Sequence, residues 1–154
     1  MKQFLLATAI CLLATVTVKA QPTSNINIDL TALSCDVMVE IMGVTPASTT
    51  CPGTLASTSG LMWLAPGMYN FDNTVLLPGS FAMNDLFAYV RVYEDDHTIA
   101  VHCIGAGWQY DVGACANTSV GPVDLGYNLT SGCQCTSNNV TITWDQPSMT
   151  LTIM

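Results

Sequence analysis

Six cysteines follow the first twenty residues of the chain and offer its clearest covalent chemistry. Zinc sites favour cysteines two residues apart and redox centres favour C-x-x-C, whereas the two closest cysteines here enclose a single residue. We therefore predict structural disulfides, and neither a metal nor a cofactor. The six positions are Cys35, Cys51, Cys103, Cys115, Cys133 and Cys135.

Spacing does not fix how these cysteines pair. Cys133 and Cys135 lie too close together on one face of a strand for an unstrained bridge to each other. We expect Cys35–Cys51 to form a local bridge. We also expect Cys103 and Cys115 each to pair into the segment that holds Cys133 and Cys135.

Residues 87–93 read FAYVRVY and place large aromatic side chains at every second position. Successive side chains of a strand point to opposite faces, so the small apolar residues are expected to face the core. The opposite face would then carry Phe87, Tyr89, Arg91 and Tyr93. A flat row of rings can bind a neutral glycan or a protein by stacking. Alternatively, other parts of the molecule cover this face and Arg91 bridges to a buried aspartate.

The acidic segment 94–97 (EDDH) is predicted to be a solvated hairpin turn. It lacks the alternating ligands, central glycine and terminal glutamate of a calcium-binding loop, so we expect no metal there. His97 and His102 are the only histidines. They match no metal or protease motif, and the strand alternation puts His102 on the surface.

The usual nucleophile motifs are missing from the chain, which contains no G-x-S-x-G, no S-x-x-K and no H-E-x-x-H. Eleven acidic residues leave a carboxylate pair as the remaining route to hydrolysis. We expect a secreted, non-enzymatic module that works by binding or surface display. A secreted hydrolase with a carboxylate pair and a purely structural extracellular domain are the alternatives.

The final two predicted strands carry threonine at alternate positions. Thr141 and Thr143 lie on one strand, and Thr150 and Thr152 on the other. Such rows superficially resemble ice-binding surfaces. Threonine is also an ordinary residue for the solvent-facing side of a strand, and four of them do not make an extended plane. We expect an ordinary wet face.

The first twenty residues indicate where the protein is sent. A positive start at Met1-Lys2 precedes an apolar run at residues 4–18, and Val18-Lys19-Ala20 suits signal peptidase. This run is too short and too close to the start to span a membrane. We predict a signal peptide over residues 1–20, export to the extracellular space or periplasm, and no membrane insertion after cleavage. Cysteines oxidise in that environment.

The charge of the exported part excludes several partners. Both lysines lie in the predicted signal peptide. The exported part therefore keeps Arg91 as its only permanent cation, against eleven acidic residues. Without lysines the chain cannot form a Schiff base or a P-loop, and it has no basic patch for nucleic acid. Anionic membranes would repel it. A neutral glycan or a protein is the favoured partner.

Alternation with period two predicts strands at residues 26–30, 37–41, 61–65, 69–71, 87–93, 98–104, 140–144 and 149–153. Residues 45–60 are predicted to be a loop, and 105–139 to be irregular apart from a strand near 123–129. No stretch has a sustained helical period. Residues 21–154 should therefore form a single disulfide-bonded domain. Its predicted fold is an antiparallel β-sandwich, immunoglobulin-like in outline, with a jelly roll or small barrel as the alternative.

Overall fold

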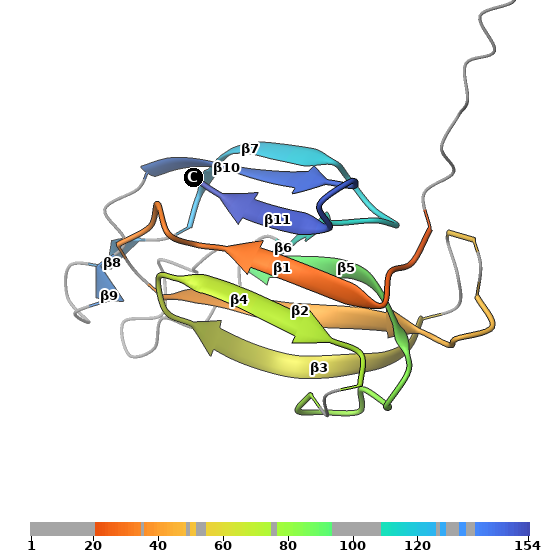
Figure 1. Cartoon of the computed structure of the whole chain (residues 1–154). Helices are drawn as coiled ribbons and strands as arrows, with labels where there is room; N and C mark the ends of the chain where they lie inside the picture. Colours follow the sequence, from red (N-terminus) through yellow and green to blue (C-terminus); the bar gives the residue numbers. More distant parts are fainter. Residues whose placement is uncertain are drawn as a thin grey trace, which may run out of the picture.

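The computed structural model describes residues 21–34, 36–48, 50–51, 55–74, 77–93, 109–125, 127–128, 133–134 and 138–154. These residues form strands and no helix (Figure 1). None of the described residues forms a helix long and apolar enough to cross a membrane. The strands are β1 (Asn25–Asp29), β2 (Val37–Val44), β3 (Leu55–Leu64), β4 (Met68–Asp72), β5 (Leu86–Tyr93), β6 (Gln109–Val112), β7 (Ser119–Asp124), β8 (Tyr127–Asn128), β9 (Cys133–Gln134), β10 (Asn138–Asp145) and β11 (Thr150–Ile153).

Two sheets pack against each other, which confirms the predicted β-sandwich. One sheet has the strand order β4-β1-β11-β10-β7 and the other has the order β3-β2-β5-β6. A short pair, β8-β9, lies apart from them (Figure 1). All neighbours are antiparallel except β1 and β11, which run parallel with Ile28 opposite Leu151. The finer immunoglobulin-like outline stays a prediction.

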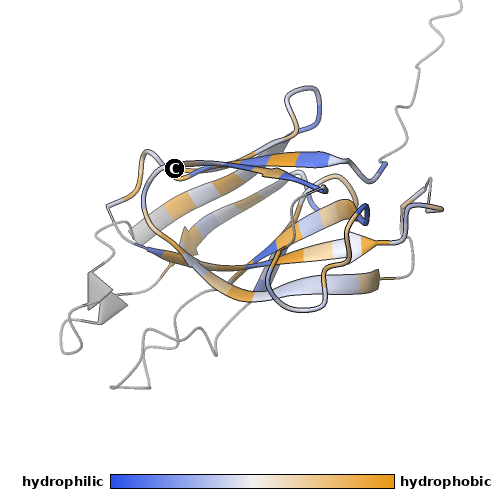
Figure 2. Ribbon diagram, turned by 60° about the horizontal axis from the view of Figure 1, so that its bottom comes forward, coloured by the Kyte–Doolittle hydropathy of each residue, from blue (hydrophilic) through white to orange (hydrophobic). Residues whose placement is uncertain are grey.

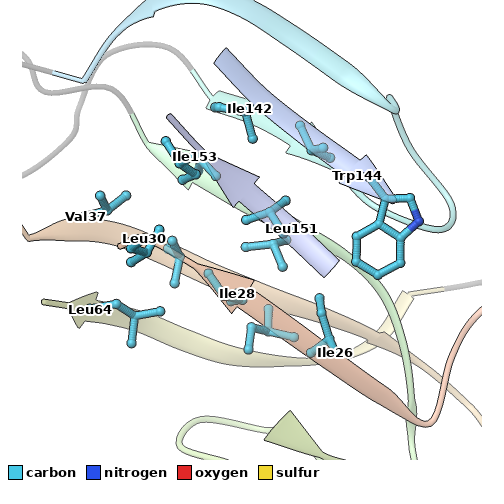
Figure 3. Close-up of a cluster of buried hydrophobic side chains, with 14 of the residues drawn as sticks. Ile26, Ile28, Leu30, Val37, Leu64, Ile142, Trp144, Leu151 and Ile153 are labelled. Carbon is cyan, nitrogen blue, oxygen red and sulfur yellow. The ribbon is translucent and has the colours of Figure 1, made fainter. Parts of the chain in front are cut away.

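The core lies between the sheets and follows from the alternation in the sequence. Hydrophobic bands alternate with hydrophilic ones along several strands (Figure 2). Ile26 and Ile28 of β1 meet Leu151 and Ile153 of β11, and Trp144 of β10 closes one end of the cluster (Figure 3). Burying one such aliphatic side chain stabilises the fold by about 1.5–3 kcal/mol.

Strand β3 is longer than its predicted part, residues 61–65, because it extends back to Leu55. The prediction of a loop through residue 60 was therefore wrong. The Ser/Thr-rich half continues the strand through an irregularity where Ile41 lies opposite Ser59 and Gly60. The buried Ser59 hydroxyl accepts a hydrogen bond from the Ile41 amide at 2.9 Å. A side chain thus replaces one ladder bond, which composition alone does not reveal.

Strand β5 pairs with β2 and β6. Its predicted hairpin partner, residues 98–104, lies outside the described residues, as do the acidic segment 94–97 and both histidines. Strand β6 falls within the region that we expected to be irregular, because four residues are too few to display a clear period.

Phe87 belongs to the core, which corrects the face predicted for it. The β2–β5 register shifts between the pairs Met42–Tyr89 and Gly43–Phe87, so one extra β5 residue lies between them. That residue is Ala88, and the shift turns Phe87 inward. Phe87 is only 1% exposed and stacks on Phe81, with ring centroids 5.1 Å apart.

Glycine at position 43 makes room for this arrangement. A Cβ atom at Gly43 would lie 2.6 Å from the Phe81 ring, which is closer than real contacts allow. The Phe81–Phe87 pair therefore requires a residue without a side chain at position 43. The shifted register thus follows from packing between residues distant in sequence.

Candidate functional site

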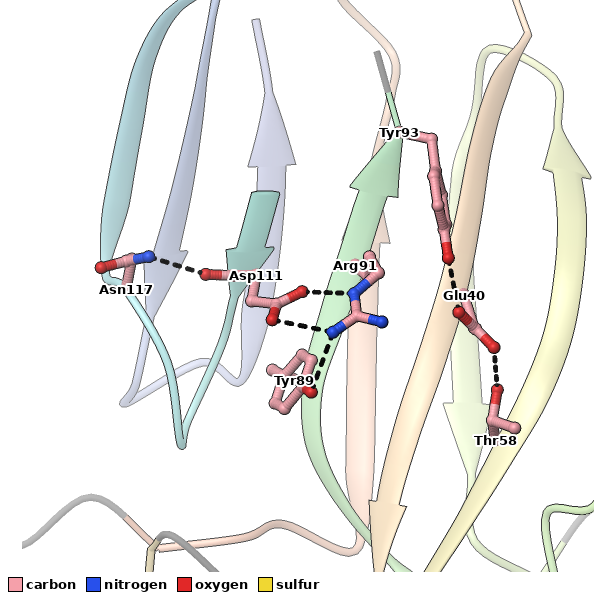
Figure 4. A network of polar contacts seen from close by, with 7 residues as sticks. All are labelled: Glu40, Thr58, Tyr89, Arg91, Tyr93, Asp111 and Asn117. Carbon is pink, nitrogen blue, oxygen red and sulfur yellow. Dashed lines mark hydrogen bonds and ion pairs between the residues drawn. The ribbon is translucent and has the colours of Figure 1, made fainter. Parts of the chain in front are cut away.

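Three of the four residues of the predicted aromatic row lie together on the outer face of the four-stranded sheet. Tyr89, Arg91 and Tyr93 project from β5 and are half-buried. Phe87 is absent from this face. We call the face formed by Tyr89, Arg91, Tyr93 and their neighbours Glu40 and Asp111 the β5 face (Figure 4).

Arg91 is held by an acid on the next strand. It lies directly opposite Asp111 of β6, and its Nε and Nη2 donate to the two carboxylate oxygens at 2.7 and 3.1 Å. The hydrogen bonds to Asp111 raise the pKa of Arg91, so the guanidinium stays charged. The alternative prediction for this face had Arg91 bridge to a buried aspartate. The carboxylate is one-third exposed rather than buried, so solvent weakens the ion pair.

Tyr89 completes this half of the β5 face. Arg91 Nη2 donates to the Tyr89 hydroxyl at 3.4 Å, and the Arg91 Cζ atom lies 5.8 Å from the ring centroid. Burial, followed by the charge of Asp111, raises the pKa of Tyr89. The phenol is therefore neutral at physiological pH, with part of its ring open to solvent.

Glu40 organises the other half of the β5 face. It lies on β2 opposite Arg91, and it accepts hydrogen bonds from the hydroxyls of Tyr93 (2.6 Å) and Thr58. Burial opposes ionisation of Glu40, but the two hydrogen bonds and the charge of Arg91 outweigh it and lower its pKa. Burial and the bond to this carboxylate raise the pKa of Tyr93 to about 12.

The turn after β6 is hydrogen-bonded to the backbones of β5 and β6. Asn117 donates from both its backbone and its side-chain nitrogen to the Asp111 carbonyl oxygen, at 3.2 and 3.1 Å. Cys115 N–H donates to the carbonyl of Ala88, the extra residue of β5, at 2.8 Å. The turn therefore fixes both strands that carry the Arg91–Asp111 pair.

A disulfide fastens this turn to the connection between β2 and β3. It joins Cys51 to Cys115, so neither the expected Cys35–Cys51 bridge nor the expected partner of Cys115 was correct. Strands β2 and β6 both run antiparallel to β5 and end at the same end of the sheet, which brings the residues after them together. Cys35, Cys103 and Cys135 lie outside the described residues, and Cys133 is described only through its place in β9.

Sequence reasoning missed two large side chains near the β5 face. Trp63 and Leu61 of β3 are 48% and 57% exposed. They lie opposite Met38 and Glu40 of β2, which puts them on the same side of the sheet as Tyr93. Alternation through residues 61–64 indicates their shared face, but only the register beside Glu40 connects them to the row on β5.

The pKa shifts of the described carboxyl groups all run in one direction. Every described carboxyl with a shifted pKa is shifted downward, namely Asp29, Glu40 and Asp72. Such groups suit hydrogen-bond acceptance and do not suit proton donation near neutral pH. Within the described ranges, no group of three or more metal-binding side chains comes together.

Comparisons of the chain with protein-family models, with curated proteins and with solved structures find no match.

Proposed function

We propose that this protein is an exported, non-enzymatic β-sandwich module that binds a neutral glycan on its β5 face. The observation that carries the proposal is the side-by-side placement of half-exposed rings and ionised hydrogen-bonding groups on one sheet face. Tyr89 and Tyr93 offer ring surface, with Arg91 between them and exposed Trp63 nearby.

A neutral sugar suits this combination of groups. Its C–H faces pack against aromatic rings, and its hydroxyls both donate and accept hydrogen bonds. Glu40 and Asp111 would accept from sugar hydroxyls while Arg91 donates. The excess of acidic residues makes anionic ligands unfavourable. The leader-like start and the Cys51–Cys115 bond support export to an oxidising compartment.

The alternatives receive less support. Hydrolysis by a carboxylate pair needs one acid with a raised pKa, whereas the shifted acids of the described chain are lowered. A purely structural domain needs no half-exposed aromatic row. A protein ligand on the β5 face would leave every oligosaccharide of the panel below without binding.

The test is a calorimetric titration of the exported protein with a panel of neutral oligosaccharides. We expect one class of glycan to bind, and Tyr93→Ala to weaken binding about tenfold through loss of ring contact. Thr152→Ala, on the outer face of the other sheet, is the matched control and should bind as wild type. If no neutral glycan binds, or if both variants bind alike, the proposal is wrong.

A further inference from the structure

Among the residues that the structure describes, the two main sheets have four edge strands, and three of these carry features that discourage pairing with another chain. Strand β4 is short and ends at Asp72, β6 has only four residues, and β7 contains Pro122 and an irregular register. Strand β3 differs from all three. It is ten residues long and contains neither a charged residue nor a proline.

The first half of β3 is already covered. Ser80 donates its N–H to the Thr58 carbonyl at 2.8 Å, and its hydroxyl accepts from the Thr58 N–H at 3.2 Å. The second half is different. Within the described part of the chain, residues 61–64 pair only with β2, and β3 forms the outer edge of its sheet (Figure 1). We call Leu61–Leu64 the open edge.

Exposed apolar side chains accompany the open edge. Leu61 and Trp63 project to the outer face, and about half of each side chain is in solvent. Exposed hydrophobic groups on an unprotected edge strand are a template for an added strand, because backbone pairing and side-chain burial then occur together.

The acidic residues beside the open edge favour one kind of added strand over another. Glu40 of β2 lies opposite Leu61, and Asp36 directly precedes Val37, the partner of Leu64. One acid thus lies one strand inward at each end of the open edge. A second copy of this acidic chain would bring no positive charge to these groups, whereas a basic segment would.

We propose that the open edge binds an extended segment of a basic protein partner by strand addition. The backbone of that segment pairs with Leu61–Leu64, and its alternate apolar side chains cover Leu61 and Trp63. Its flanking Lys or Arg side chains reach toward Asp36 and Glu40. The backbone of the added strand bonds to the sheet edge, whereas its side chains share Glu40 and Trp63 with the proposed glycan site.

The probe is a short peptide of alternating Val and Thr with a Lys at each end, titrated into the full exported protein. We expect saturable binding to wild type and at least tenfold weaker binding to Leu61→Lys, which places a like charge on the edge. Met83→Lys is the matched control, because Met83 is 58% exposed and lies outside β3. It should bind as wild type.

Two further peptides separate the contributions of backbone pairing and of charge to peptide binding. A version with alternate amides N-methylated should not bind, because it cannot complete the ladder, and a version with Glu in place of Lys should bind at least tenfold more weakly. Equal binding of either version overturns the proposal, as does no binding of the parent peptide. Concentration-dependent dimerisation that Leu61→Lys abolishes would overturn it too, because the occupant would then be a second copy.

Discussion

The outer faces of the two sheets are built on the same alternating pattern but differ in what they present. The β5 face carries Tyr89, Arg91 and Tyr93, whose polar atoms bond to acids on neighbouring strands (Figure 4). The outer face of the five-stranded sheet carries mostly short side chains along β1, β10 and β11, although Met68 of β4 is also exposed there. Thr143 and Thr152 lie opposite each other there, and Asn70 donates to Asn27 at 2.6 Å.

The polar bonds of the second face include several that stay within one turn. Asp29 accepts from both the N–H and the hydroxyl of Thr31, and Asp145 accepts from both the N–H and the hydroxyl of Ser148. Such bonds cap strand ends and leave little side-chain surface for a ligand. The difference indicates that recognition depends on side-chain size and cross-strand bonding rather than on exposure alone.

The largest effect on stability is expected when an inward-facing residue of β5 is removed and compared with an outward-facing one. Phe87→Ala removes a ring that is 1% exposed and is expected to lower the free energy of unfolding by about 4 kcal/mol. Tyr89→Ala, on the β5 face, should cost about 1 kcal/mol. Urea unfolding measures both. Equal costs would mean that Tyr89 is as much a core residue as Phe87.

Removing the disulfide tests how the β5 face is held. The Cys51→Ser/Cys115→Ser double variant loses a cross-link between residues 64 apart, and the free energy of unfolding should fall by about 4 kcal/mol. Hydrogen exchange of the amides in the turn after β6 should accelerate more than that of β10 and β11. Uniform acceleration in both sheets would show that the bond has no local effect on the β5 face.

Glu40 makes the stability of the β5 face depend on pH. Because its pKa is lowered in the folded protein, its contribution is present above the unfolded pKa, near 4.5, and is lost as pH falls through the lower folded value. Glu40→Gln should cost about 1 kcal/mol at pH 7, since solvent screens part of the interaction. The difference from wild type should shrink below about pH 4. If the difference in unfolding free energy between Glu40→Gln and wild type did not depend on pH, the lowered pKa of Glu40 would be contradicted.

The smallest effect is expected on the opposite face. Thr152→Val keeps a β-branched residue on a half-exposed strand position and should change the free energy of unfolding by less than about 0.5 kcal/mol. Urea unfolding measures it beside the β5 variants. A loss above 1 kcal/mol would show that the threonine rows contribute more than a wet face does, and would weaken the contrast between the two faces.

Much of the fold follows from local patterns. The alternation at residues 26–30, 37–41 and 140–144 predicts β1, β2 and β10, because a strand with one buried face must repeat every two residues. The alternation at residues 87–93 also predicts which residues flank Arg91. The alternative prediction had Arg91 bridge to a buried aspartate; Arg91 does pair with Asp111, but that carboxylate is one-third exposed.

Tertiary structure decided the features that depend on distant residues. Phe87 faces inward because a register shift opposite Gly43 leaves room for it beside Phe81, and no pattern within residues 87–93 records that space. Cys51 meets Cys115 because two strands that flank β5 end at the same end of the sheet. The sequence alone determined the period, and hence the two faces of each strand. Register and strand order, which arise from packing between segments far apart in the chain, decided which side chains meet.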